Sequence, residues 1–150
     1  MIRGVSIVLP DTDNVKILKA LFSLIEEDYL LLINKIEIAS DNPWLKDGIY
    51  RRSEFDKALD TSSAAILLGE FWGITESMSY ADILPGNYDQ FIASIIDFVI
   101  FITDFSEIDI YIKNSSRAEK IYNLMTSTFA KSIVKYITDA NDSRTVFSVY

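Results

Sequence analysis

The sequence predicts a single α+β domain over residues 1–150, with a mixed, largely antiparallel sheet of about six or seven strands and helices packed on it. Segments with alternating or continuous apolar residues, which are typical of strands, occur in both halves of the chain. Segments with helical apolar spacing lie between them. The length suits one domain with one core, and no repeat, low-complexity tract or Pro/Gly/Ser-rich linker divides the sequence.

The chain begins with a predicted strand and an amphipathic helix. Alternate residues of the segment 2–9 are apolar and face one way: Val5, Ile7 and Leu9. Pro10 ends this strand, and Asp11 or Asp13 is the expected N-cap of a helix over residues 14–25. The apolar stripe of that helix consists of Leu18, Leu21, Phe22 and Ile25.

A strand, a loop and a short helix are predicted next. Residues 29–39 have β character, and residues 40–48 contain Asn-Pro and Asp-Gly pairs that are typical of turns. Ser53, followed by Asp56, is expected to start a helix over residues 54–60. The residues of this helix that should face inward are Phe55, Ala58 and Leu59.

The middle of the chain predicts a strand with two covered faces and a second short helix. Residues 64–74 are apolar on both faces of the expected strand. The loop that follows contains Met78, Tyr80, Pro85 and Gly86. Asn87, with Gln90 three positions later, starts a helix whose apolar stripe is Tyr88, Phe91, Ile92 and Ile95.

Two strands around a tight turn at residues 104–106 follow. The first, over residues 96–103, is apolar on both faces and should be central in the sheet. In the second, one face carries Ile108, Ile110 and Ile112. The other face carries Glu107, Asp109, Tyr111 and Lys113, which is typical of a strand with one face in solvent.

The last elements are a helix and a closing hairpin. Ser116 and Glu119 form a predicted capping box at the start of the helix. Its core face consists of Ala118, Ile121, Tyr122, Met125 and Phe129. Residues 133–137 and 146–150 are predicted to pair as strands on either side of a polar loop.

The absence of cysteine and histidine excludes several kinds of chemistry. Disulfides, thiolate or imidazole metal sites, a Cys nucleophile and any Ser-His or Cys-His dyad are impossible. The sequence also lacks a Gly-rich phosphate loop and a nucleophile elbow. We therefore predict no cofactor and no metal, and identify no catalytic residue.

The net charge of −8 and the isoelectric point near 4.5 oppose binding to nucleic acid, because phosphates are repelled. The same field attracts a basic protein, and it also keeps a protein in solution. The first apolar run is too short for a signal peptide, and the longest apolar stretch, residues 95–102, is interrupted by Asp97. We expect a cytoplasmic protein that does not enter a membrane.

The polar segment 138–145 is the strongest candidate for a site. It contains Asp139, Asn141, Asp142 and Arg144. Its acidic start is similar to a calcium loop, but the glycine at the sharp turn and the final glutamate are absent. Arg144 with a carboxylate such as Asp139 would suit an anchor for a bound polar group. We favour the simpler interpretation, in which Asp and Asn side chains close a turn between two strands, and keep the anchor as the alternative.

Other residues carry further hypotheses. Arg144, close in sequence to two aspartates, is expected to clamp the loop so that residues 146–150 pair in the sheet. Trp44, in a predicted loop, is either an interface anchor or a side chain packed over the sheet edge. The acids on or beside strands, two of which would form a general acid and base pair if they converged, are Glu70, Asp97, Asp104, Glu107 and Asp109.

These observations favour a non-catalytic acidic binding protein that masks a basic protein partner, as immunity-type proteins do. The alternative is a small hydrolase or transferase that uses carboxylates. The oligomeric state stays open.

Four segments carry a resemblance to a known family: RGVSIVLP near the start, IIDFVIFITDFSEIDIYIKN, IYNLM, and YITDANDSRTVFSVY at the end. Both ends and the second half resemble a family of small uncharacterised bacterial proteins, the domain-of-unknown-function family numbered 2691. Residues 33–88 show no such similarity, and Tyr150 stands where the family suggests tryptophan. The resemblance implies no activity and transfers no catalytic residue.

Overall fold

A computed structural model describes residues 1–10, 13–75 and 84–150 of the chain. The described residues contain seven strands and four helices. The strands are β1 (Ile2–Val8), β2 (Leu30–Ile38), β3 (Gly48–Arg51), β4 (Ile66–Ile74), β5 (Phe98–Thr103), β6 (Glu107–Ile112) and β7 (Ile133–Thr138). The helices are α1 (Asn14–Ser23), α2 (Arg52–Asp60), α3 (Tyr88–Ala93) and α4 (Ser115–Thr128).

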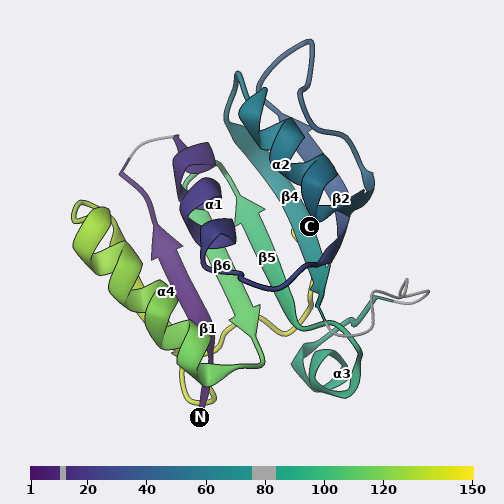
Figure 1. The fold of residues 1–150 in the computed structure, drawn as a ribbon. Coiled ribbons are helices and arrows are strands. Elements are labelled where there is room, and N and C mark those ends of the chain that lie inside the picture. Colours follow the sequence, from purple (N-terminus) through teal and green to yellow (C-terminus); the bar gives the residue numbers. More distant parts are fainter. Residues whose placement is uncertain (11–12, 76–83) are drawn as a thin grey trace.

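The seven strands form one sheet in the order β3-β2-β4-β5-β6-β1-β7 (Figure 1). Every pair of neighbouring strands is antiparallel. The predicted α+β class, strand number and packed helices are therefore confirmed, and the described sheet is antiparallel throughout. Strand β1 lies between β6 and β7, so the start of the chain pairs with two strands from its second half.

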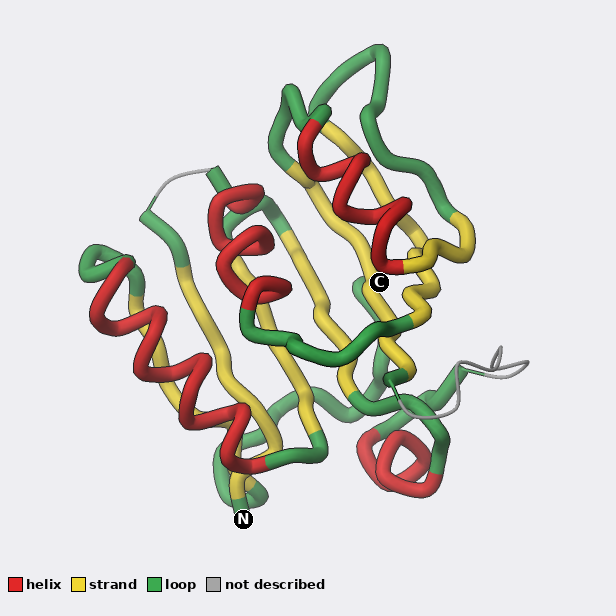
Figure 2. The backbone as a smooth tube through the Cα atoms, viewed as in Figure 1, coloured by secondary structure: helices red, strands yellow, loops and turns green. Residues whose placement is uncertain are grey.

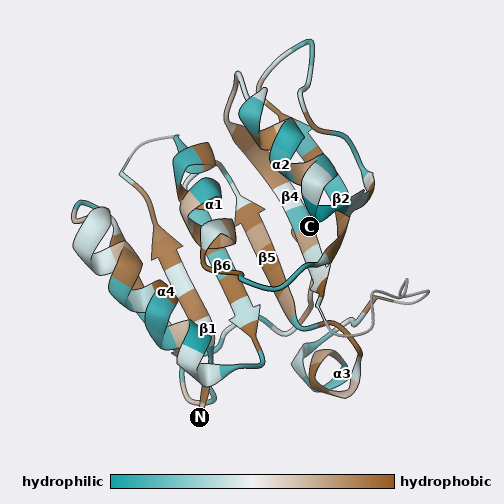
Figure 3. Ribbon diagram, viewed as in Figure 1, coloured by the Kyte–Doolittle hydropathy of each residue, from teal (hydrophilic) through white to brown (hydrophobic). Residues whose placement is uncertain are grey.

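Helices α1, α2 and α4 lie on the same face of the sheet (Figures 1 and 2). The expected inward residues of the predicted first strand and helix are all buried there. The isoleucines of β6 face the same way and are also buried: Ile108, Ile110 and Ile112. Apolar colour follows the strands and the inner sides of these helices in Figure 3, as period-2 and period-3.6 patterns require.

A second apolar cluster covers the opposite face of the sheet. It combines residues of β4, β5, β6 and β7 with helix α3 and the C-terminal segment: Trp72, Ile74, Tyr88, Phe91, Ile96, Val99, Phe101, Tyr111, Ile137 and Phe147. Tyr111 is 1% exposed. The prediction that its face of β6 is half in solvent is therefore wrong for Tyr111, because the C-terminal segment covers it.

The predicted closing hairpin is also wrong in its second half. Strand β7 forms as expected, but residues 146–150 contain no strand. After β7 the chain leaves the sheet edge, and the N–H of Phe147 donates to the carbonyl of Gly86 at 2.9 Å. The apolar residues that suggested a strand instead cover the open face: Phe147 packs in the second cluster, and Val149 packs against it.

Smaller differences concern caps, an edge strand and one helix. The predicted caps Ser53 and Ser116 are not used. At α2, the N–H of Arg51 donates to Glu54 at 3.0 Å, and Asn114 caps α4.

The short edge strand β3 follows the predicted loop directly. Two residues of the stripe expected on the second short helix, Ile92 and Ile95, are 45% and 48% exposed. The loop positions Met78 and Tyr80 lie outside the described residues.

A buried asparagine joins α1 to the sheet. Asn14 is fully buried, and its Nδ2 donates to the carbonyls of Ile66 and Phe105 at 2.6 and 3.0 Å. Its Oδ1 accepts from the N–H of Ile66 at 3.0 Å. One side chain therefore satisfies backbone groups at the start of β4 and in the turn between β5 and β6.

We predict that Asn14→Ala lowers the free energy of unfolding by about 3 kcal/mol, because it leaves an N–H and two carbonyls without this partner in a buried place. Urea denaturation measures the change. The matched control is Asn123→Ala on the exposed side of α4, which should change stability by less than about 0.5 kcal/mol. Equal stability of the two variants would contradict the role of Asn14.

Candidate functional site

The predicted polar loop is built as a turn around Asn141. Its Oδ1 accepts from the N–H of Thr138 at 2.7 Å, and its Nδ2 donates to the carbonyl of Tyr136 at 3.1 Å. Asp139 is exposed and pairs with Arg3 at 3.1 Å. These contacts close the loop and hold it against β1.

Asp142 is the buried centre of the loop. Its side chain is 3% exposed and accepts from the hydroxyl of Tyr111 at 2.7 Å and from Arg3 at 3.1 Å. The N–H of Arg144 donates to the same carboxylate at 3.1 Å. Burial and the Asp142 hydrogen bond raise the pKa of Tyr111, so this phenol stays neutral and donates its proton.

Arg144 acts as a clamp, but with partners other than those expected. Its Nη2 lies 2.9 Å from Asp109 on β6, and its Nη1 donates to the carbonyl of Ser148 at 2.7 Å. The guanidinium carbon lies 4.4 Å from the ring centroid of Phe101. The Arg144 side chain thus joins β6 to the C-terminal segment, whereas Asp139 pairs with Arg3.

The C-terminal segment also docks on a buried carboxylate. Glu70 on β4 is 2% exposed, and its Oε2 accepts from the N–H of Val149 at 3.0 Å. Lys35 lies 3.5 Å from the same oxygen and donates to Ser148 Oγ at 2.6 Å. Lys35 sits in a bulge of β2 with φ of 55°, and a bulge of this kind turns a side chain away from its regular direction.

Trp44 does not join these residues. Its Nε1 donates to the carbonyl of Ala64 at 2.8 Å, and its ring packs, half-buried, against the helix-side core. Of the predicted site residues, the structure thus brings Asp139, Asn141, Asp142 and Arg144 together and places Trp44 elsewhere.

A shallow cavity lies beside this loop, on the outer face of β1, β6 and β7. It has a volume of about 260 Å³, and its lining includes the acids Glu107, Asp109 and Asp142. Asp109 and Asp142 are paired with arginines, as described above. Both carboxylates therefore already use oxygens in contacts within the protein.

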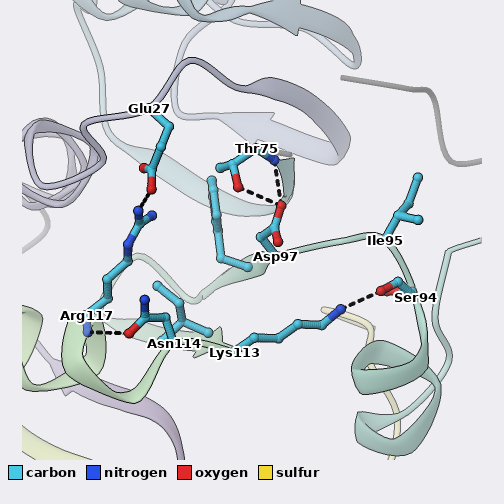
Figure 4. A pocket seen from close by; sticks show the side chains of 10 residues that line it. Glu27, Thr75, Ser94, Ile95, Asp97, Lys113, Asn114 and Arg117 are labelled. Carbon is cyan, nitrogen blue, oxygen red and sulfur yellow. Dashed lines mark hydrogen bonds and ion pairs between the residues drawn. The ribbon is translucent and has the colours of Figure 1, made fainter. Parts of the chain in front are cut away.

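A larger cavity of about 550 Å³ opens at the ends of β4, β5 and β6, where α4 begins (Figure 4). Asp97 precedes β5, and its Oδ2 accepts from the N–H and the hydroxyl of Thr75 at 2.6 and 2.8 Å. Arg117 on α4 pairs with Glu27, and Lys113 Nζ donates to the carbonyl of Ser94. The cavity therefore carries two carboxylates and two cations.

The apolar part of this cavity is formed by Ile95, Phe98 and Ile112. Asp97 was predicted as one of five acids beside strands, but Glu27, Thr75 and Arg117 were not singled out. Glu27 and Thr75 come from two connections and Arg117 from α4, and only the strand order shows that these parts meet at one end of the sheet.

The described residues offer no obvious metal centre. Within 1–10, 13–75 and 84–150, no group of three or more His, Cys, Asp and Glu side chains is arranged to hold a metal ion. Asp104 lies exposed in the turn between β5 and β6, and Glu70 is covered by the C-terminal segment.

We predict that Phe147→Ala destabilises the protein by about 3 kcal/mol. The Phe147 ring is 4% exposed, and its centroid lies 4.7 Å from that of Tyr111 and 5.4 Å from that of Phe101. Amide exchange at Phe147 and Val149 should become faster, because the segment loses its apolar anchor. Val146→Ala, at a residue that is 61% exposed, is the control and should leave exchange unchanged. Slow exchange in Phe147→Ala would contradict the docking.

We also predict a pH effect at Tyr111. Because the folded state raises its pKa above the value of about 10 expected in an unfolded chain, the unfolded chain releases this proton first as the pH rises. The resulting stability is fully present below about pH 10 and is lost above it. Urea denaturation between about pH 9 and pH 11 should therefore show a smaller loss of stability in Tyr111→Phe than in the wild type. Equal losses would contradict the assignment.

Comparisons with known proteins place the chain in a family without assigning an activity. No curated protein and no solved structure matches it. Among the described residues, no helix combines the length and apolar composition that crossing a bilayer requires. A family model described as a protein of unknown function, DUF2691, matches residues 2–148. The match covers nearly the whole chain, including residues 33–88, for which no resemblance was predicted, and the chain therefore belongs to the DUF2691 family.

Proposed function

We propose that the protein is a non-catalytic binding protein whose acidic surface binds a basic protein, in the manner of an immunity-type protein. One observation carries this proposal: the excess negative charge lies on the surface. Among the described residues that are exposed, fifteen are Asp or Glu and nine are Lys or Arg. Charged residues that are buried or half-buried are nearly balanced, with four acids and five bases. A field of this kind attracts a basic partner and speeds association.

The connection between α1 and β2 is the part of this surface that we assign to the partner. It carries three consecutive exposed acids, Glu26, Glu27 and Asp28. Arg52 Nη1 donates to the carbonyl of Glu27 at 2.6 Å, which ties this connection to α2. A binding surface held in place loses less conformational entropy when the partner binds.

The pairing of the acids in both cavities supports a binding role over catalysis. Asp109, Asp142 and Glu27 each pair with an arginine, and Asp97 accepts two hydrogen bonds from Thr75. These contacts already use oxygens of each carboxylate, whereas a general acid or base must exchange a proton with the substrate. We also propose that the protein is cytoplasmic. A chain without cysteine has no disulfide bond that the reducing environment there would break.

The second candidate is a carboxylate-dependent hydrolase or transferase, and one observation favours it. Two acids, Glu27 and Asp97, line the cavity of about 550 Å³, which is within the usual size range of a ligand site. A hydrolase screen in which Asp97→Asn abolishes turnover while the protein stays folded would establish this function in place of the first.

We predict that a pull-down from the native host, followed by mass spectrometry, recovers a basic protein. Its affinity should fall as the salt concentration rises, because exposed charges are screened. Glu26→Gln/Asp28→Asn should weaken binding several-fold, mainly through the association rate. The control Asp41→Asn/Glu119→Gln removes the same charge elsewhere and should have a smaller effect. A partner that binds equally well to both variants at all salt concentrations would overturn the proposal.

A further inference from the structure

The cavity at the ends of β4, β5 and β6 carries side chains of both charges. Figure 4 shows Arg117 and Lys113 on the side formed by β6 and α4, and Glu27 and Asp97 toward the α1–β2 and β4–β5 connections. We propose that this cavity binds a small zwitterion with an apolar group, of the class of a free amino acid with an aliphatic side chain. This inference does not rest on the acidic surface proposed for a protein partner, although Glu27 belongs to both.

The carboxylates suit an ammonium group. Asp97 is fixed by its backbone as well as its side chain, since its N–H donates to Gly73 at 2.8 Å and its carbonyl accepts from the N–H of Lys113 at 3.2 Å. The N–H and the hydroxyl of Thr75 both donate to Oδ2 of the Asp97 carboxylate. Each carboxylate oxygen offers further lone pairs, so a ligand ammonium can bond to Asp97 without breaking the Thr75 contacts.

The cations suit a carboxylate. Arg117 uses Nη2 toward Glu27, and a guanidinium has five N–H donors in a planar fork that fits a carboxylate. Glu27 therefore orients Arg117 and leaves other donors of the same group for a ligand. Lys113 enters the cavity from the end of β6, where its ammonium adds a second positive charge.

The apolar surface selects among zwitterions. Ile95, Phe98 and Ile112 line the cavity, and Ile95 is 48% exposed. Phe98, Ile112 and Arg117 also line an adjoining narrow cleft, whose other lining residues are Leu21, Leu24, Ile25, Ile100, Ile110, Lys120 and Ile121. An aliphatic side chain placed against Ile95 would remove apolar surface from water, which a ligand without a side chain cannot do.

The test uses L-leucine with three analogues that each lack one feature. Glycine lacks the side chain, 3-methylbutylamine lacks the carboxylate, and 4-methylpentanoate lacks the ammonium. Titration of the isotope-labelled full chain, followed by amide chemical shifts, should show saturable leucine binding at Thr75, Asp97 and Lys113. Each analogue should bind about tenfold more weakly or worse, because one charged contact or the apolar contact is lost.

Variants locate the binding groups. Arg117→Gln should weaken leucine binding about tenfold and leave 3-methylbutylamine unaffected, whereas Asp97→Asn should weaken leucine binding and leave 4-methylpentanoate unaffected. Asp104→Asn, in the exposed turn, is the control and should bind leucine as the wild type does. Absence of leucine shifts at millimolar concentration, or equal binding of all four compounds, would overturn the proposal. Neither outcome would bear on the protein partner, because that test substitutes Glu26 and Asp28 and measures recovery and affinity of a protein.

Discussion

A sheet that is apolar on both faces must be covered on both faces, and the rest of this structure depends on that requirement. Strands β4 and β5 bury residues on each side, and three helices cover one of these sides. On the other side, α3 is six residues long and cannot span seven strands. The C-terminal segment therefore completes the second layer, with Phe147 at its centre.

The polar groups under that segment follow from the same requirement. An irregular segment brings backbone N–H and carbonyl groups onto an apolar face, and each buried one needs a partner. Glu70 and Arg144 provide such partners for Val149 and Ser148. Burying a carboxylate is costly unless it is paired, and Lys35 provides the pairing for Glu70. The family model reaches residue 148, so the family pattern includes most of this covering segment.

Much of the fold could be predicted from the sequence, and the failures have a common physical cause. Periodicity identified β1, α1, β2 and the β5–β6 pair because local apolar patterns reflect which face is buried. It failed for residues 146–150, whose apolar and aromatic residues fit a strand as well as an irregular segment that buries one ring in an aromatic cluster. Tyr111 was assigned to solvent for the same reason, since nothing local indicates what will cover a face.

The candidate sites divide in a similar way. Residues close in sequence, such as Asn141 and Asp142, were recognised as a polar group, and the turn geometry agrees with the favoured interpretation. Glu27, Thr75 and Arg117 are far apart in sequence and meet only because of the strand order. No local sequence pattern therefore indicates that they line one cavity. The partner of Arg144 was not predicted because Asp109 lies on β6, 35 residues earlier in the chain.

The position of β1 between β6 and β7 affects how the chain reaches this structure. During synthesis, the first strand emerges long before either of its neighbours, and its apolar residues cannot be paired until more than a hundred further residues have been made. Pairings between residues so distant in sequence are slow to form, because a long loop must close first. The nascent chain therefore exposes an unpaired apolar strand until those residues have been made, a period in which chaperones or aggregation compete with folding.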